Sequence, residues 1–190
     1  MTVTTTQPST LPGLSTGTWV IDPAHTEVGF VVRHMMVSKV KGRFAGVEGT
    51  ITVAEDVLTS SVEATIDAAS IDTRDVNRDG HLKSADFFEV EKYPTITFRS
   101  TGLRADGDDF VLDGDLTIRG TTRPVSLELE FNGTQPNPLA EGKPTAGFSA
   151  HTEISRKDFG LEWNVALETG GVLVADKIKI LLEVEAGLAS

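Results

Sequence analysis

Apolar and polar residues alternate along most of the chain. The clearest stretch is residues 125–131, in which Val125, Leu127, Leu129 and Phe131 are separated by single polar residues. Because successive side chains of a β-strand point to opposite faces of the sheet, this pattern predicts strands with one buried face. Similar stretches bring the prediction to eight or nine strands; the others lie at residues 19–22, 27–33, 44–53, 62–67, 96–98, 110–118, 148–154 and 178–184.

Segments rich in Gly, Pro, Asp and Asn separate the predicted strands, for example at residues 105–109, 119–124 and 132–144. These residue types favour turns, and short turns between consecutive strands favour antiparallel hairpins. A sheet of this many strands protects its edges best by closing on itself. The predicted fold class is therefore all-β, with a single antiparallel β-barrel over residues 17–190. Alternation alone is also compatible with a β-sandwich.

Residues 73–93 break the alternating pattern and stop at Pro94. Either Asp72 or Thr73 could cap the start of a short helix here, because both side chains accept hydrogen bonds from backbone N–H groups. Three apolar residues at helical spacing predict that this helix packs on the barrel near one open end: Leu82, Ala85 and Phe88. A second short helical turn is expected near residues 158–164.

Residues 1–16 are rich in Thr, Ser, Pro and Gly and are predicted to form a disordered polar tail. The first ten residues contain no Lys or Arg and no continuous apolar segment, which a secretory signal requires. We therefore expect a cytoplasmic protein. No apolar run approaches the length of about 20 residues that a transmembrane helix needs.

The chain has 190 residues, enough for one domain, and its 17 Lys and Arg against 28 Asp and Glu give a formal charge of −11. Such a charge repels phosphate backbones and anionic lipid surfaces, so no nucleic-acid partner is expected. The absence of Cys excludes disulfides, thiolate catalysis and cysteine-based metal sites. The oligomeric state stays open, with a homodimer among the alternatives.

The interior of an eight-stranded barrel is either filled by its own side chains or holds one small ligand. The residues expected to point inward are apolar, so a ligand would also have to be apolar. Those expected to line a cavity are Phe30, Val32, Phe44, Ile66, Phe98, Leu116, Ile118, Phe148 and Ile154. Composition and alternation do not decide between a packed core and a cavity.

One segment resembles a calcium-binding loop. Asp75, Asn77, Asp79 and Gly80 match its first half, but Asp86 stands where the loop needs a bidentate Glu, and a strand rather than a helix precedes it. A calcium-type binding module therefore remains an alternative.

The four His residues show no metal-ligand spacing, so no metal site is predicted. For His25, next to Asp22 and Thr26, a structural hydrogen bond in the turn is expected. No phosphate loop, dinucleotide fingerprint or nucleophile elbow is present, and the chain is not expected to be an enzyme. An enzyme of unidentified activity is the remaining alternative.

Motifs along most of the chain resemble those of the YceI-like family of bacterial polyisoprenoid-binding proteins. They include Tyr93-Pro-Thr-Ile-Thr-Phe-Arg-Ser100 and Arg78-Asp-Gly-His-Leu82. The remaining matching blocks lie at residues 19–22, 25–26, 30–34, 37–44, 70–73, 84–88, 114–120, 124–125 and 154–160.

The resemblance implies an eight-stranded, lipocalin-like antiparallel barrel with one or two short helices near an open end and an elongated apolar cavity. It implies storage or transport of an isoprenoid lipid, such as a polyprenyl chain or an isoprenoid quinone, with no other cofactor. The resemblance also implies that Arg78, Asp79 and His81 of this chain form a polar cluster at the cavity mouth. His25 is a further candidate for a polar residue at the mouth. Many members carry a secretory signal, which the first residues of this sequence do not lead us to expect here.

Overall fold

The computed structural model describes residues 10–189 of the chain. Residues 1–9 of the predicted polar tail therefore lie outside the described residues. Residues 10–16 lie against the barrel, and Leu14 packs with the buried Trp19, whose indole N–H donates to the backbone oxygen of Ser15 at 2.9 Å. Within residues 10–189, no helix has the length and hydrophobicity needed to cross a bilayer.

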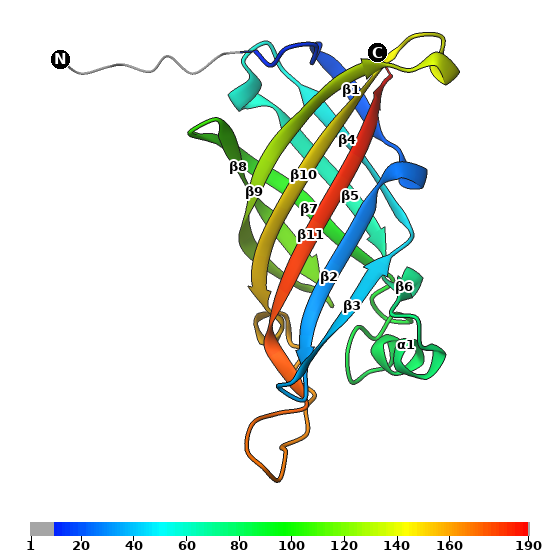
Figure 1. The fold of residues 1–190 in the computed structure, drawn as a ribbon, viewed down its shortest axis with the longest axis vertical. Helices are drawn as coiled ribbons and strands as arrows, with labels where there is room; N and C mark the ends of the chain where they lie inside the picture. The colour runs from blue at the N-terminus through cyan, green and yellow to red at the C-terminus, as the bar shows by residue number, and fades with distance from the viewer. Residues whose placement is uncertain (1–9, 190) are drawn as a thin grey trace, which may run out of the picture.

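Eight strands form a closed antiparallel ring, which confirms the predicted barrel (Figure 1). Hydrogen bonds between β1 and β11, with Trp19 opposite Leu188, close the ring. In order around the ring, the strands are β1 (Gly17–Ile21), β4 (Val47–Val53), β5 (Ser61–Asp67), β7 (Thr95–Asp106), β8 (Asp109–Ile118), β9 (Thr121–Pro136), β10 (Pro144–Ser155) and β11 (Val174–Leu188).

Three further strands extend the ring at one end: β2 (Glu27–His34), β3 (Ser38–Phe44) and β6 (Ile71–Asp72). Strand β2 pairs with the same edge of β11 as β1 does, and the short 3₁₀ turn η1 (Pro23–His25) separates the two strands. The alternation did not predict β3 because Val40 is the only bulky apolar residue on its inner face before Phe44, and Gly42 separates the two.

The segment after β6 forms the helix α1 (Val76–Lys83), which confirms a short helix but corrects its start. Asp75 is the N-cap and accepts from the backbone N–H of Arg78 at 3.0 Å. Asp72 instead accepts from the backbone N–H of Arg74, which has a positive φ of 66° and cannot continue a helix. Ala85 and Phe88 therefore lie beyond the helix end.

The remaining helical turns are short and of the 3₁₀ type. They are η2 (Val57–Thr59), η3 (Ala68–Ser70), η4 (Pro138–Ala140) and η5 (Arg156–Phe159), the last of which overlaps the turn expected near residues 158–164.

The two ends of the barrel differ in what lies there (Figure 1). At the terminus end, residues 10–16 and the last residues of β11 come together. At the helix end lie α1, the β2–β3 turn and the long connection between β10 and β11, residues 160–173.

Candidate ligand-binding cavity

A cavity of about 290 Å³ lies inside the barrel and reaches towards both ends. Its lining includes Leu11 and Leu14 of the segment that lies at the terminus end and Leu82 of α1 at the helix end. Its volume lies near the lower limit of roughly 300–1,000 Å³ that is usual for ligand pockets. The barrel is therefore not filled completely by its own side chains.

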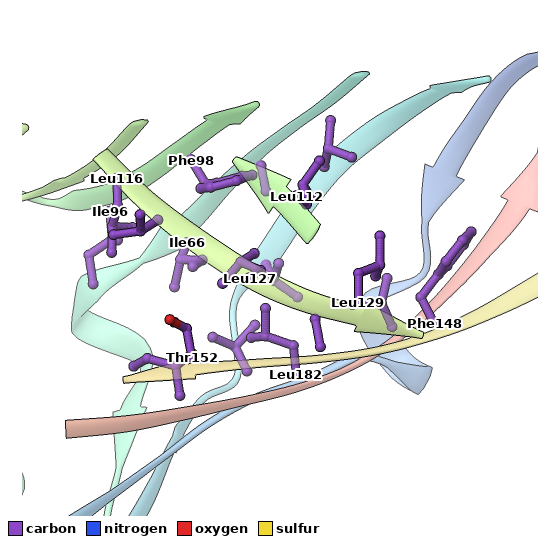
Figure 2. Close-up of a pocket in the computed structure, with 18 of the residues that line it drawn as sticks. Ile66, Ile96, Phe98, Leu112, Leu116, Leu127, Leu129, Phe148, Thr152 and Leu182 are labelled. Atoms are coloured by element: carbon purple, nitrogen blue, oxygen red, sulfur yellow. The ribbon is translucent and has the colours of Figure 1, made fainter. Parts of the chain in front are cut away.

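The cavity wall is almost entirely apolar. Among its described lining residues, the polar ones are Thr26, Ser60, Ser61, Thr152 and Arg156. The labelled side chains in Figure 2 carry carbon atoms only, apart from the hydroxyl oxygen of Thr152. A wall of this kind offers few hydrogen bonds, so it favours an apolar ligand and penalises the burial of a polar one.

All nine residues that alternation placed on the inner face line this cavity. Figure 2 shows four of them, Ile66, Phe98, Leu116 and Phe148, around the same space. Their contact with a ligand stays a prediction. Alternation succeeded for eight of them because each lies on a regular strand that it predicted, where inward and outward positions follow from the period of two. Phe44 instead ends β3, and the predicted strand over residues 44–53 is broken before β4 begins at Val47.

Two glycines make room for the aromatic rings in the wall. Gly42 lies directly opposite Phe30, and a Cβ atom at position 42 would collide with the Phe30 ring. Gly114 lies opposite Ser100, and a Cβ atom there would likewise collide with the ring of Phe98. Because both rings line the cavity, larger residues at these glycines would push the rings from their present positions.

Side chains from outside the regular strands close the helix end of the cavity. Phe87, Phe159 and Leu161 are buried there, and Phe88 packs edge-on against Phe44 with a centroid distance of 5.7 Å. Strand alternation does not identify these residues, because they lie on turns and loops where the period of two is lost. Their hydrophobicity was the available signal, and only their place in the fold brings them together.

The predicted polar cluster anchors α1, but none of its residues lines the cavity. Asp79 accepts hydrogen bonds from the backbone N–H and the hydroxyl of the buried Thr73, at 2.9 and 2.5 Å. Arg78 donates to the hydroxyl and the carbonyl oxygen of the same Thr73. These bonds hold the start of α1 to the chain that follows β6.

His81 belongs to the same region but has different neighbours. Its Nε2 lies 2.8 Å from a carboxylate oxygen of Asp86, and its ring meets those of Phe87 and Trp163 at centroid distances of 5.1 and 4.7 Å. His81 therefore joins α1 to the 160–173 connection, which lies far from it in sequence.

Arg156 is a buried cation that the sequence did not predict as a site residue. Its side chain is among the lining residues, yet its guanidinium donates to the backbone oxygens of Leu161, Trp163, Val174 and Ala175 at 2.7–3.1 Å. Burial lowers the pKa of this guanidinium. Arg156 fixes both ends of the 160–173 connection and so holds the helix end of the cavity together.

His25 is separate from the other three mouth candidates. Its Nδ1 lies 2.7 Å from Asp22 and 3.6 Å from Glu185, which confirms a structural role in the turn at η1. The bond to Asp22, followed by the charge of Glu185, raises the pKa of His25, while the same bond lowers the pKa of Asp22. His25 does not line the cavity.

The calcium-loop alternative is wrong. Residues 76–83 form a helix rather than an open loop, and Asp75 and Asp79 already accept backbone hydrogen bonds.

One other group of side chains has the spacing of possible metal ligands. The ligand atoms of Asp22, His25 and Glu185 lie within 4.8 Å of one another. These side chains are partly or fully exposed, and His25 already interacts with both carboxylates.

Comparisons with known proteins agree with this architecture. The sequence model of the YceI-like domain matches residues 19–186. A UPF0312 protein of Staphylococcus aureus strain N315 is 37% identical over 175 residues, covering 90% of this chain and 98% of the relative.

Two solved structures have similar folds. The YCEI protein of Campylobacter jejuni is 33% identical, with a TM-score of 0.71 over 89% of this chain and 96% of its own. A polyisoprenoid binding domain from Saccharophagus degradans is 16% identical, with a TM-score of 0.67 over 90% of this chain and 98% of its own. At 16% identity this second likeness concerns the fold alone.

Proposed function

Since the chain belongs to the YceI-like family, we propose that it binds, stores or transports a long apolar isoprenoid lipid in its cavity without catalysing a reaction. A polyprenyl chain or an isoprenoid quinone fits this description. The observation that carries the proposal is the elongated cavity whose wall is apolar from one end of the barrel to the other. The similar fold of the polyisoprenoid binding domain from Saccharophagus degradans supports the same ligand class.

Such a cavity can bind a lipid tail through burial alone. Transfer of apolar surface out of water contributes roughly 25 cal/mol per Å², so a tail of several isoprene units gains many kcal/mol. Part of this gain is offset by the lost freedom of the tail and of the ligand as a whole. Selection among apolar tails should therefore depend mainly on their length and thickness.

The cavity chemistry favours binding over catalysis. General acid–base catalysis needs a titratable side chain within hydrogen-bond reach of the reacting group. Among the described lining residues, Arg156 is the one charged group, and backbone carbonyls occupy its guanidinium. The cytoplasmic location and the homodimer stay predictions.

Replacement of Ala64 by Trp tests the proposal, because Ala64 lies on β5 and lines the cavity. The indole would occupy space that the lipid needs, at a cost of about 1–3 kcal/mol in stability. We expect native mass spectrometry of the purified wild type to show a bound isoprenoid that organic extraction removes. The A64W variant should lack this extra mass and take up no added isoprenoid quinone.

Val20→Trp is the matched control, since Val20 lies on β1 and is 47% exposed. This variant should carry the lipid as the wild type does. Equal lipid occupancy in A64W and wild type would show that no tail fills the barrel. A wild type that binds no isoprenoid but converts a small substrate would favour the enzyme alternative instead.

A further inference from the structure

The formal charge of −11 is not spread evenly over the molecule. Five exposed cations lie on the outer surface of β2, β3 and the first half of β11, and we call this surface the basic face: Arg33, Lys39, Lys41, Lys177 and Lys179. Removal of these five positive charges from the total leaves −16 for the remainder of the chain. The net charge of the whole chain therefore does not describe the basic face, which carries positive charge locally.

The strand register gathers these cations without pairing them with acids. Arg33 lies directly opposite Lys39, and Lys179 and Lys41 flank Val31 on either side. Like charges directly opposite each other destabilise a sheet. Across residues 10–189, none of the five cations forms a salt bridge, although Glu153 of β10 lies in register with Lys179.

Elsewhere on the outer wall, opposite charges face each other. Arg99 lies 3.1 Å from Glu63, and Arg104 lies 2.7 Å from Asp113, whose pKa falls to about 2 through the hydrogen bond from Arg104. The fold thus accommodates charge pairs between strands, and it does not require the unpaired cations of the basic face.

An apolar tip, Met35 to Val37, projects from the basic face. Met35, Met36 and Val37 form the β2–β3 turn and are 46%, 50% and 80% exposed. Met35 and Met36 have positive φ angles of 50° and 63°, a conformation for which turns prefer Asn and Gly. The sequence therefore keeps large apolar side chains in water at a position where smaller polar residues would be more stable.

The apolar tip lies next to the helix end of the cavity. The backbone N–H of Met35 donates to Leu173 at 2.8 Å, and His34 pairs with Val174, which lines the cavity together with Val32. Figure 1 shows the β2–β3 turn and the 160–173 connection side by side at this end. The cavity wall thus continues to the base of the apolar tip.

We propose that the basic face and the apolar tip dock the protein on the surface of a bilayer that contains anionic phospholipids. Lysine and arginine near such a surface each contribute roughly 1 kcal/mol, and exposed apolar side chains insert at the boundary between headgroups and acyl chains. The acidic remainder repels the same surface, so the protein docks in one orientation. That orientation presents the helix end of the cavity to the lipid.

Vesicle co-sedimentation tests this docking with the purified full chain. We expect wild type to bind vesicles of phosphatidylcholine with phosphatidylglycerol (7:3) and to bind pure phosphatidylcholine vesicles far less. Lys41→Gln should weaken binding about fivefold, which corresponds to one cation near the surface. Lys143→Gln is the matched control, because Lys143 is exposed in the β9–β10 connection at the terminus end, and it should bind as wild type does.

A double variant separates the apolar tip from the charges. Met35→Asn with Met36→Gly suits the positive φ angles of the turn, so the fold should be at least as stable as that of wild type. Its binding to anionic vesicles should nevertheless fall, because the inserting side chains are gone. Circular dichroism and thermal melts establish that the variants are folded.

Several results would overturn the proposal. They are equal binding to both vesicle types, unchanged binding in K41Q or in the double variant, and binding of a short DNA duplex in place of vesicles. A self-associated protein whose dimer dissociates in K41Q, without vesicle binding, would assign the basic face to a second copy. Docking does not require a lipid in the cavity. A wild type that binds vesicles but carries no isoprenoid would therefore contradict the proposed lipid-binding function and leave the docking proposal intact.

Discussion

The two ends of the barrel are closed in different ways. At the terminus end, strand residues pack against each other: Trp19, Ala146 and Ala186 have no exposed surface. At the helix end, the buried Phe87 and Phe159 come from segments between strands. The terminus end is thus built mainly on the hydrogen-bonded sheet, with Leu11 and Leu14 packed against it, whereas side chains from turns and loops hold the helix end.

This difference identifies the end that can open. Opening of the ring at the terminus end requires loss of strand pairing between β1, β4 and β11, and hence of the barrel itself. The helix end depends on a few local contacts of Arg156, Asp79 and His81. Segments held by few contacts open with a smaller free energy than the whole fold, so we expect lipid to pass through the helix end.

The largest effect is expected for Arg156→Met. Four backbone carbonyls lose a charged donor, and unfolding free energy should fall by about 3–5 kcal/mol. Hydrogen exchange should accelerate at the amides of Leu161 and Leu173 before it does at the terminus end. Arg99→Met, on the exposed outer wall, is the control and should change little. Uniform acceleration over the whole barrel would contradict a separate helix end.

A smaller effect is expected for Asp79→Ala. The backbone N–H and the hydroxyl of Thr73, which is 3% exposed, lose their acceptor, at a cost of about 1–3 kcal/mol. Chemical denaturation measures this loss, and release of a bound isoprenoid should become faster as α1 loosens. Asp115→Ala, an exposed carboxylate on β8, is the control. Unchanged release in D79A would show that α1 does not close the cavity.

The smallest effect is expected for His25→Gln, because His25 takes no part in the contacts described above that close the two ends of the barrel. The pKa of His25 is raised in the folded chain by Asp22 and Glu185, so protonated His25 stabilises the fold. This contribution is fully present below the ordinary pKa of histidine and is lost as pH rises through the raised pKa. The melting temperature of H25Q should therefore fall below that of wild type at pH 5.5 and equal it at pH 8.5. The same difference at both pH values would exclude this linkage.

The regular strands were predictable because their side chains follow a strict period of two. Residues such as Phe30, Ile66 and Phe148 needed only this alternation to be placed on the cavity wall. The start of α1 was less predictable, because Asp72, Thr73 and Asp75 are all suitable caps. The positive φ of Arg74, which the sequence does not reveal, selected Asp75.

Local alternation and turn chemistry specify antiparallel strands with an apolar inner face, because both act over a few residues. The folded chain alone shows that the sheet closes into a ring, that its inner face encloses a cavity, that Arg156 and α1 close one end, and that Arg33, Lys41 and Lys179 form one surface. Each of these features depends on residues that are distant in the chain and become neighbours through strand register. That register is a property of the whole ring, and no local pattern specifies it.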